Sequence, residues 1–529
     1  MRISLFCAGL FFSAFATGQL EKATDDWKSK DLVLDKIPGI SLDQSYNQLA
    51  VYKAATPIIV AVLDSGVEVD HDDLKSNIWV NNDETPGNGI DDDNNGYIDD
   101  VHGWNFLGGE NGDVQYDNLE FTRVYKGLKD RFENQDPKAI TKADKEDFDR
   151  FELMREQFKK RITEAEQNYQ EYNAINMFFQ MSQNTIAGMI DGEMTPEKVK
   201  ALPSGDEQFE AMRELILASF EEDIAGQLEG AMAHFRNAKN YSYNLDVDSR
   251  DIIGDNYADL DERIYGNNHY EGPDASHGTH VAGIIAGTRD NGLGMQGVAD
   301  VAKIMVLRVV PDGDERDKDI ANAIRYATDN GAKIINMSFG KAYSPHKEAV
   351  DAAVKYASDK GVVFVHAAGN SSNNNDKSNN FPNPIYKTSR ELCPTWIEVG
   401  ASNWVNGKKL PADFTNYGKK SVDVFAPGVD IYSTVPDNGY KKFSGTSMAA
   451  PVVSGLVALI WSRYPDLEAK DIRNIIVKSC ADYKKTRVIL PSSAEKQKTT
   501  KFKKLSRTGG IVNALNAFQM AEDYKRSFE

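Results

Sequence analysis

The chain of 529 residues is poor in cysteine and in basic side chains. It holds only 3 cysteines, and because Cys7 lies in the first apolar run, the rest of the chain offers at most one disulfide, between Cys393 and Cys480. A scaffold held by many disulfides is therefore excluded, while the pairing of these two residues stays open. Lys and Arg number 61 against 80 Asp and Glu, a net charge of −19, which argues against nucleic acid as a partner.

Long apolar runs are absent after the first twenty residues. Residues 1–18 combine a basic Arg2, an apolar run and the small residues Ala14 and Ala16, which is the pattern of a secretory signal peptide. This run is too short to cross a bilayer, and the later run GLVALIW at 455–461 reads as a buried helix. We expect an exported protein (periplasmic, cell-surface or extracellular) without a transmembrane anchor.

Short β-rich runs alternate with helical patterns along most of the chain. IIVAVLDSG, KIMVLRVV, KIINMSFG and VVFVHAAGN are separated by stretches such as DKDIANAIRYATDNG. This order predicts an α/β fold with a mostly parallel sheet and helices on both faces. Asp64 and Asn370 then lie at the carboxyl ends of strands, where open α/β sheets place their sites.

Four residues provide the groups that acyl-transfer chemistry needs. Ser447 opens a helical segment in SGTSMAAP, and Asp64, His277 and Asn370 precede it in AVLDSGV, HGTHVAG and AAGN. A serine hydroxyl needs an imidazole to take its proton, and the imidazole needs a carboxylate to orient it. The backbone N–H of Ser447 and the amide of Asn370 are suited to stabilise an oxyanion.

These motifs, in the order acid, histidine, serine, resemble the subtilisin-like serine peptidases (subtilases) of the secreted bacterial type. The likeness covers about Ala50–Asp100 and Gly272–Lys478. It implies a serine endopeptidase that cleaves polypeptide substrates through an acyl-enzyme. It also implies a substrate-binding strand and a primary specificity pocket, which match Ser338, Phe339, Gly340, Ala368 and Gly369. The apolar surroundings of Phe339 favour an apolar preference.

Two other functions compete with this interpretation. An inactive, peptide-binding relative would have lost at least one of the four residues, and none is lost. A glutamate-using serine-carboxyl peptidase also contains SGTS, but HGTH supplies a histidine where that chemistry needs an acid. Labelling by a fluorophosphonate separates an active serine enzyme from an inactive one.

An acidic loop and a second pair of residues predict structural calcium. NGIDDDNNGYIDD carries oxygen ligands at alternate positions and a glycine for a sharp turn, with the candidate ligands Asp91, Asp93, Asn95, Tyr97 and Asp99. The twelfth position is His102 instead of the glutamate of an EF-hand, and a solvated acidic turn is the alternative. A second site, at Asp73 and Asn291, is implied only by the resemblance.

The region 110–240 departs from the family pattern. Apolar residues recur at three- and four-residue spacing in two stripes, Phe151–Tyr172 and Phe209–Phe235, which predicts a helical hairpin. We expect a signal peptide (1–18), an N-terminal extension (19–56) and one peptidase domain (57–528), interrupted by this insertion, in a monomer. The hairpin is either a neutral decoration, since loop closure costs only about 0.6 kcal/mol per doubling of length, or a wall of the substrate cleft.

Overall fold

The structure is a computed structural model that describes residues 22–48, 53–491 and 498–527. The predicted signal peptide and the start of the N-terminal extension lie outside the described residues. Within these three ranges, no helix is both long and apolar enough to cross a membrane. Cys393 and Cys480 are both free thiols, and burial raises the pKa of Cys480 to about 12.

A nine-stranded sheet forms the centre of the molecule, in the order β12-β15-β9-β8-β7-β6-β1-β5-β2. All its neighbouring strands pair in parallel except β12 and β15 at one edge, which confirms the predicted α/β class. The strands are β1 (Ile58–Asp64), β2 (Gly103–Asn105), β5 (Ala302–Arg308), β6 (Ile334–Met337), β7 (Val363–Ala367), β8 (Trp396–Ser402), β9 (Val424–Pro427), β12 (Ala481–Asp482) and β15 (Gly510–Ile511). Two-stranded ribbons are formed by β3 (Gly108–Gly109) with β4 (Gly112–Asp113), β10 (Ile431–Val435) with β11 (Gly439–Phe443), and β13 (Arg487–Ile489) with β14 (Thr499–Lys501).

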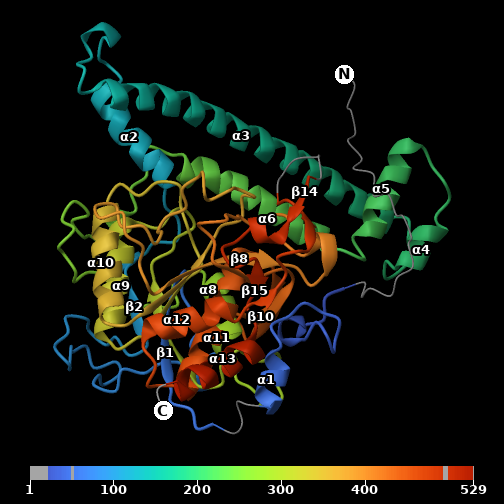
Figure 1. Ribbon diagram of the computed structural model, residues 1–529. Helices are drawn as coiled ribbons and strands as arrows, with labels where there is room; N and C mark the ends of the chain where they lie inside the picture. The colour runs from blue at the N-terminus through green and yellow to red at the C-terminus, as the bar shows by residue number, and fades with distance from the viewer. Residues whose placement is uncertain (1–21, 49–52, 492–497, 528–529) are drawn as a thin grey trace.

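Helices cover both faces of this sheet because its buried strands are apolar on both sides. In β1, Val60 and Val62 join one core cluster, whereas Ala61 and Leu63 join the other. The first cluster includes α8 (Ser276–Ala286), α11 (Thr446–Arg463), α12 (Ala469–Lys478) and α13 (Ala514–Arg526), and the second includes α9 (Asp317–Asp329) and α10 (Lys347–Asp359). Figure 1 shows α9 and α10 together on one flank, away from α11, α12 and α13. The short helices α1 (Leu42–Gln48) and α7 (Arg250–Ile253) add Leu42 to the first cluster and Ile253 to the second.

The region between β4 and α7 is helical and stands over the catalytic core. It consists of α2 (Glu120–Phe132), α3 (Lys145–Ala187), α4 (Pro196–Ala201), α5 (Glu207–Ala218) and α6 (Ile224–Asn237). The helix α3 has 43 residues and runs across the molecule above α6, with α4 and α5 near its far end (Figure 1). Two small cores hold it: one of aromatic residues where α2 meets α3, and one where α3 meets α4, α5 and α6.

The second apolar stripe forms two helices in the structure, although the sequence pattern predicts a single helix. The structure divides Phe209–Phe235 into α5 and α6, with a turn at 219–223. Asp223 accepts a hydrogen bond from the N–H of Gly226 and thereby begins a new helix. Three consecutive acidic residues, Glu221 to Asp223, also oppose continuation, because negative charge is unfavourable at a helix C-terminus.

Candidate active site

The acid and the base of the predicted triad are in direct contact. Asp64 ends β1 and His277 is the second residue of α8. His277 Nδ1 lies 2.7 Å from Asp64 Oδ1, and the N–H of Ser65 donates to the same oxygen at 2.8 Å. Asp64 is only 1% exposed. A buried carboxylate at this position holds the ring with Nε2 free to accept a proton.

The environment of His277 favours its charged form. Removal of water from the ring opposes protonation, but the charge of Asp64 and its hydrogen bond outweigh this, so the pKa of His277 is raised above its ordinary value. A raised pKa makes the imidazole a stronger base. The pair can therefore stabilise the imidazolium that forms when a hydroxyl gives up its proton.

Ser447 is the second residue of α11, which begins at Thr446 directly after the extended Gly445. Its hydroxyl donates to the carbonyl oxygen of Ser338 at 2.9 Å, and the Ser338 hydroxyl donates to the carbonyl oxygen of Ser447 at the same distance. Among the described hydrogen bonds, none joins Ser447 to His277. Attack would require the Ser447 side chain to rotate towards His277, and catalytic hydrogen bonds commonly tighten only when substrate binds.

Asn370 lies beside the start of α11, where hydrogen bonds to its side-chain oxygen hold it in place. Asn370 Oδ1 accepts from the N–H of Thr446 at 2.9 Å and from its hydroxyl at 2.8 Å. The Thr446 hydroxyl also accepts from the N–H of Gly369 at 3.1 Å. A carbon placed on Gly445 would lie 3.5 Å from both Asn370 Nδ2 and the N–H nitrogen of Ser447. The Asn370 amide nitrogen and the Ser447 N–H nitrogen therefore lie on the same side of Gly445.

The predicted substrate-binding residues directly follow two strands: one group comes after β6 and the other after β7. Ser338 directly follows β6 and lies at the cleft of Asp64 and His277. Gly340 comes two residues later, and a side chain there would meet Asn380 Oδ1 at 2.5 Å. Phe339 is half-buried beside His366.

Gly369 has a φ of +102°, a conformation that glycine adopts without strain. Ala368 is 0% exposed and packs in a core cluster with Phe425, so its methyl group does not line the cleft.

A cavity of about 350 Å³ adjoins the acid–base pair. Asp64, His277 and Ser338 line it, and Gln115 and Asp312 line it on the side of the helical insertion. Ser338 therefore connects this cavity with Ser447, because the two serines exchange hydrogen bonds.

Comparison with known proteins shows the family of the chain. The sequence profile of the Subtilase family matches residues 56–507. The chain belongs to the subtilase family. It is 41% identical over 220 residues to the thermophilic serine proteinase of Bacillus sp. strain AK1, a match that covers 41% of this chain and 49% of the relative.

Two further subtilases show similar identity. The cell wall-associated protease of Bacillus subtilis strain 168 is 37% identical over 239 residues, which cover 45% of this chain and 25% of the relative. Subtilisin DY of Bacillus licheniformis is 42% identical over 201 residues, which cover 37% of this chain and 68% of that protein. The match spans about half of the AK1 proteinase and a quarter of the cell wall-associated protease.

Arg308, which the sequence motifs did not single out, holds the main chain next to Asp64. It ends β5 opposite Asp64 and is 2% exposed. Its Nε donates to the carbonyl oxygen of Ser65 at 2.9 Å, and its guanidinium also donates to Asn105 Oδ1 and to the carbonyl oxygen of Val114. Burial lowers the pKa of Arg308 to about 10. An arginine at the end of a strand that is apolar except for Lys303 was the only sequence signal of this position.

The structure brings one of the five predicted loop ligands, Asp93, together with other carboxylates. The carboxylates of Asp91 and Asp99 accept hydrogen bonds from main-chain N–H groups of the loop, which fixes its turns. Asn95 donates to Asp93 and Asp100. The Tyr97 side chain is buried in an aromatic cluster, and its hydroxyl donates to the carbonyl oxygen of Arg263.

Glu84, Asp93 and Asp100 form the carboxylate cluster of this loop, with one oxygen from each within 4.8 Å of the others. None of the three makes a described ion pair with Lys, Arg or His. Burial raises the pKa of Asp100 to about 6 despite hydrogen bonds from Tyr326, Asn81 and Asn95. Three hard oxygen donors without a positive partner fit a calcium ion. Only Asp93 was among the predicted ligands, since Glu84 lies before the motif.

Asp73 and Asn291 are brought together as the resemblance implied. Asn291 Nδ2 donates to Asp73 Oδ1 at 2.7 Å, and the N–H of Met295 and the Tyr440 hydroxyl both lie 3.3 Å from Asp73 Oδ2. Asp73 is fully buried. Its oxygens are thus satisfied by protein donors in this structure.

Proposed function

We propose that the protein is an exported serine endopeptidase that hydrolyses peptide bonds through Ser447, His277 and Asp64. The observation that carries the proposal is the 2.7 Å contact between His277 Nδ1 and Asp64, in a cavity that Ser338 links to Ser447. A buried carboxylate, a raised pKa of His277 and a serine at a helix start are the groups that acyl transfer needs.

In the first half-reaction His277 Nε2 takes the proton of the Ser447 hydroxyl while Oγ bonds to the carbonyl carbon of the substrate. The carbonyl oxygen becomes an oxyanion and accepts from Asn370 Nδ2 and the N–H of Ser447. His277 then gives its proton to the amine as the C–N bond breaks, which leaves an acyl-enzyme. Water, activated by the same imidazole, releases the acid and restores the hydroxyl.

The substrate lies as an extended chain along residues 338–340 in this proposal. Main-chain hydrogen bonds to Ser338 and Gly340 supply affinity for any sequence, and pockets between the strands select side chains. Gly369, next to Asn416 and Asn380, lies at the end of the primary pocket. Unfolded or flexible polypeptides meet this requirement because they can become extended.

Structural calcium is part of the same proposal. Glu84, Asp93 and Asp100 would hold the ion, which would supply positive charge to the cluster and cross-link the acidic loop to the residues before it. Tyr326 of α9 donates to Asp100, so the ion would also stabilise the contact of this loop with the core. Such an ion is structural and takes no part in the acyl transfer.

The experiment is labelling of the purified protein with a fluorophosphonate, alongside Ser447→Ala. We expect labelling and peptide hydrolysis in the wild type, and loss of both in the variant, which should keep its melting temperature. A wild-type protein that folds and binds peptides but neither reacts nor cleaves would refute the proposal and favour an inactive, peptide-binding relative.

A further inference from the structure

The wall of the cavity beside His277 carries more negative than positive charge. Apart from His277, the charged side chains that line it are Asp64, Asp274, Asp312 and Arg308. Three carboxylates against one guanidinium leave a net negative charge whether His277 is neutral or protonated. A cleft lined mainly by charge of one sign attracts ligands of the opposite sign.

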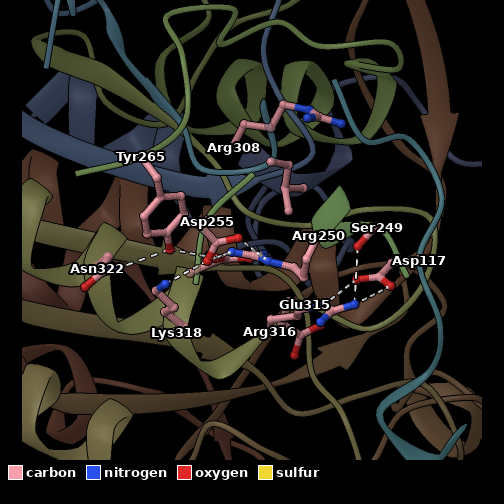
Figure 2. A network of polar contacts seen from close by, with 12 residues as sticks. Asp117, Ser249, Arg250, Asp255, Tyr265, Arg308, Glu315, Arg316, Lys318 and Asn322 are labelled. Atoms are coloured by element: carbon pink, nitrogen blue, oxygen red, sulfur yellow. Dashed lines mark hydrogen bonds and ion pairs between the residues drawn. The ribbon is translucent and has the colours of Figure 1, made fainter. Parts of the chain in front are cut away.

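The guanidinium of Arg308 is used within the protein. Arg308 is only 2% exposed, and its N–H groups donate to the carbonyl oxygen of Ser65, to Asn105 Oδ1 and to the carbonyl oxygen of Val114. In Figure 2 its side chain lies apart from the ion pairs of Arg250. The positive charge of Arg308 is therefore not directed at the carboxylates that open to solvent.

Asp274 and Asp312 are the exposed carboxylates of this cavity, and neither makes an ion pair among the described residues. Asp274 Oδ1 accepts from the N–H of Ser276 at 2.9 Å, and Asp312 Oδ2 accepts from Asn237 Nδ2 at 3.3 Å. These neutral donors leave the two negative charges uncompensated. In the same wall, Asp64 Oδ2 is buried and has no described hydrogen-bond partner.

The surplus of negative charge continues along the chain before Asp274. Burial raises the pKa of Glu271, and the charges of Glu68, Asp70 and Asp437 raise it further. Neighbouring carboxylates raise a carboxyl pKa because like charges disfavour ionisation. The raised pKa therefore indicates that negative charge accumulates on this side of the cleft.

Main-chain pairing fixes Asp312 at the cavity. The N–H of Asp312 donates to the carbonyl oxygen of Gln115 at 2.7 Å, and the N–H of Asp117 donates to the carbonyl oxygen of Asp312 at 3.1 Å. Gln115 lines the same cavity. Arg316 in turn donates to both oxygens of Asp117, at 2.8 and 3.0 Å (Figure 2). The two paired segments thus present Gln115 and Asp312 together.

The root of the helical insertion holds residues 312–316 in place. Asp314 accepts from the N–H of Glu120, the first residue of α2. Arg123 donates to the carbonyl oxygens of Asp314 and Glu315. Buried Lys341, directly after the substrate-binding residues, makes an ion pair with Glu120 at 2.9 Å. Because these buried charges are paired, the segment cannot shift without leaving a charge uncompensated.

The cavity beside His277 is close to the nucleophile, because Ser338 both lines it and exchanges hydrogen bonds with Ser447. Successive side chains of an extended chain point to opposite sides. The residue that supplies the scissile carbonyl points to the primary pocket at Gly369 in the proposed function. The side chain before it therefore points away from that pocket and needs a site of its own.

We propose that the cavity beside His277 is the subsite for this preceding side chain, that it takes the positive charge of Lys or Arg, and that Asp274 and Asp312 determine the preference. This inference rests on the proposed function. An ammonium or guanidinium supplies the donors that two uncompensated carboxylates accept. The apolar preference expected from Phe339 concerns a different substrate residue.

The test uses quenched peptides built on a sequence that the wild type cleaves, with Lys, Gln or Glu as the residue before the scissile one. Asp274→Asn and Asp312→Asn are made singly and together, and Asp466→Asn is the matched control. Asp466 is exposed between α11 and α12 and does not line the cavity, so this variant removes the same charge elsewhere. Mass spectrometry confirms the bond cut, and the readout is the ratio of kcat/KM between the Lys and Gln peptides.

We expect the wild type to cleave the Lys peptide best and the Glu peptide worst. Each single substitution should lower the Lys-to-Gln ratio roughly threefold, and the pair roughly tenfold, mainly through KM. Asp466→Asn should keep the wild-type ratio. In the wild type, added salt should also lower the ratio, a measurement that needs no variant.

Equal kcat/KM of the wild type on the Lys and Gln peptides overturns the subsite. A ratio that survives in the double variant, or that falls as far in Asp466→Asn, overturns it as well. A wild type that cleaves no peptide and does not react with a fluorophosphonate would instead refute the proposed function.

Discussion

Thr446 should control turnover through its hydroxyl, although it does not take part in the proton transfer. Its O–H donates to Asn370 Oδ1 at 2.8 Å and its oxygen accepts from the N–H of Gly369 at 3.1 Å. Thr446→Val removes both hydrogen bonds and keeps the shape. Each bond contributes about 1 kcal/mol, so we expect a loss of about 1–3 kcal/mol in unfolding free energy. Asn370 Oδ1 then keeps only the hydrogen bond from the Thr446 N–H, so its amide is oriented less firmly.

The loss in kcat has an upper bound, because removal of the corresponding asparagine side chain in subtilisin costs about 10²–10³. Thr446→Val only loosens the amide, so we expect roughly a tenfold fall in kcat with an unchanged KM, measured on a short anilide. Thr446→Ser keeps the hydroxyl and should retain kcat. In an Asn370→Ala background, Thr446→Val should cost nothing further. If the two losses in kcat simply multiply, Thr446 does not act through Asn370 and the reasoning is refuted.

Three further predictions concern pH, calcium and the buried charges. The raised pKa of His277 keeps the ring protonated to higher pH, and only the neutral ring can accept a proton. We therefore expect kcat/KM to fall as the pH drops through a value above the ordinary histidine pKa. Asp64→Asn should move this acidic limb of the pH profile to lower pH. A calcium chelator should lower the melting temperature, with about 2.7 kcal/mol lost if calcium was present at 100 times its Kd, and Asp100→Asn should abolish this response. Lys341→Met should lower the free energy of unfolding, measured in urea, by about 3–5 kcal/mol, because Glu120 and Asp317 lose their buried partner. The exposed Lys355→Met should change this free energy little, and equal effects of the two substitutions would contradict this account.

The elements that position the catalytic residues could be predicted from local patterns. A short apolar run rich in β-branched residues and followed by Gly, such as IIVAVLDSG, favours a buried strand, and β1 spans Ile58–Asp64. Amphipathic periodicity likewise predicted α9 and α10. These patterns involve residues only a few positions apart in the chain, so they can be recognised from the sequence alone.

The supporting residues could not be predicted, because their roles depend on contacts between distant segments. Thr446 meets Asn370 across 76 positions and Arg308 meets Ser65 across 243. The acidic loop shows a second reason. Main-chain amides donate to Glu84 and Asp93 as well as to Asp91 and Asp99, and only the folded loop brings Glu84, Asp93 and Asp100 within 4.8 Å of one another.

The sequence by itself determined the α/β class and the candidate groups for acyl transfer, since residue type and local periodicity carry that information. It also predicted a helical insertion between Asp64 and His277, but not where that insertion lies. Only the tertiary structure decided that its root is held to Asp314, Glu315 and Lys341 and that a cavity opens beside Asp312. The physical reason is that buried ion pairs between distant segments set the position of the helical insertion on the core, and no local pattern encodes such pairs.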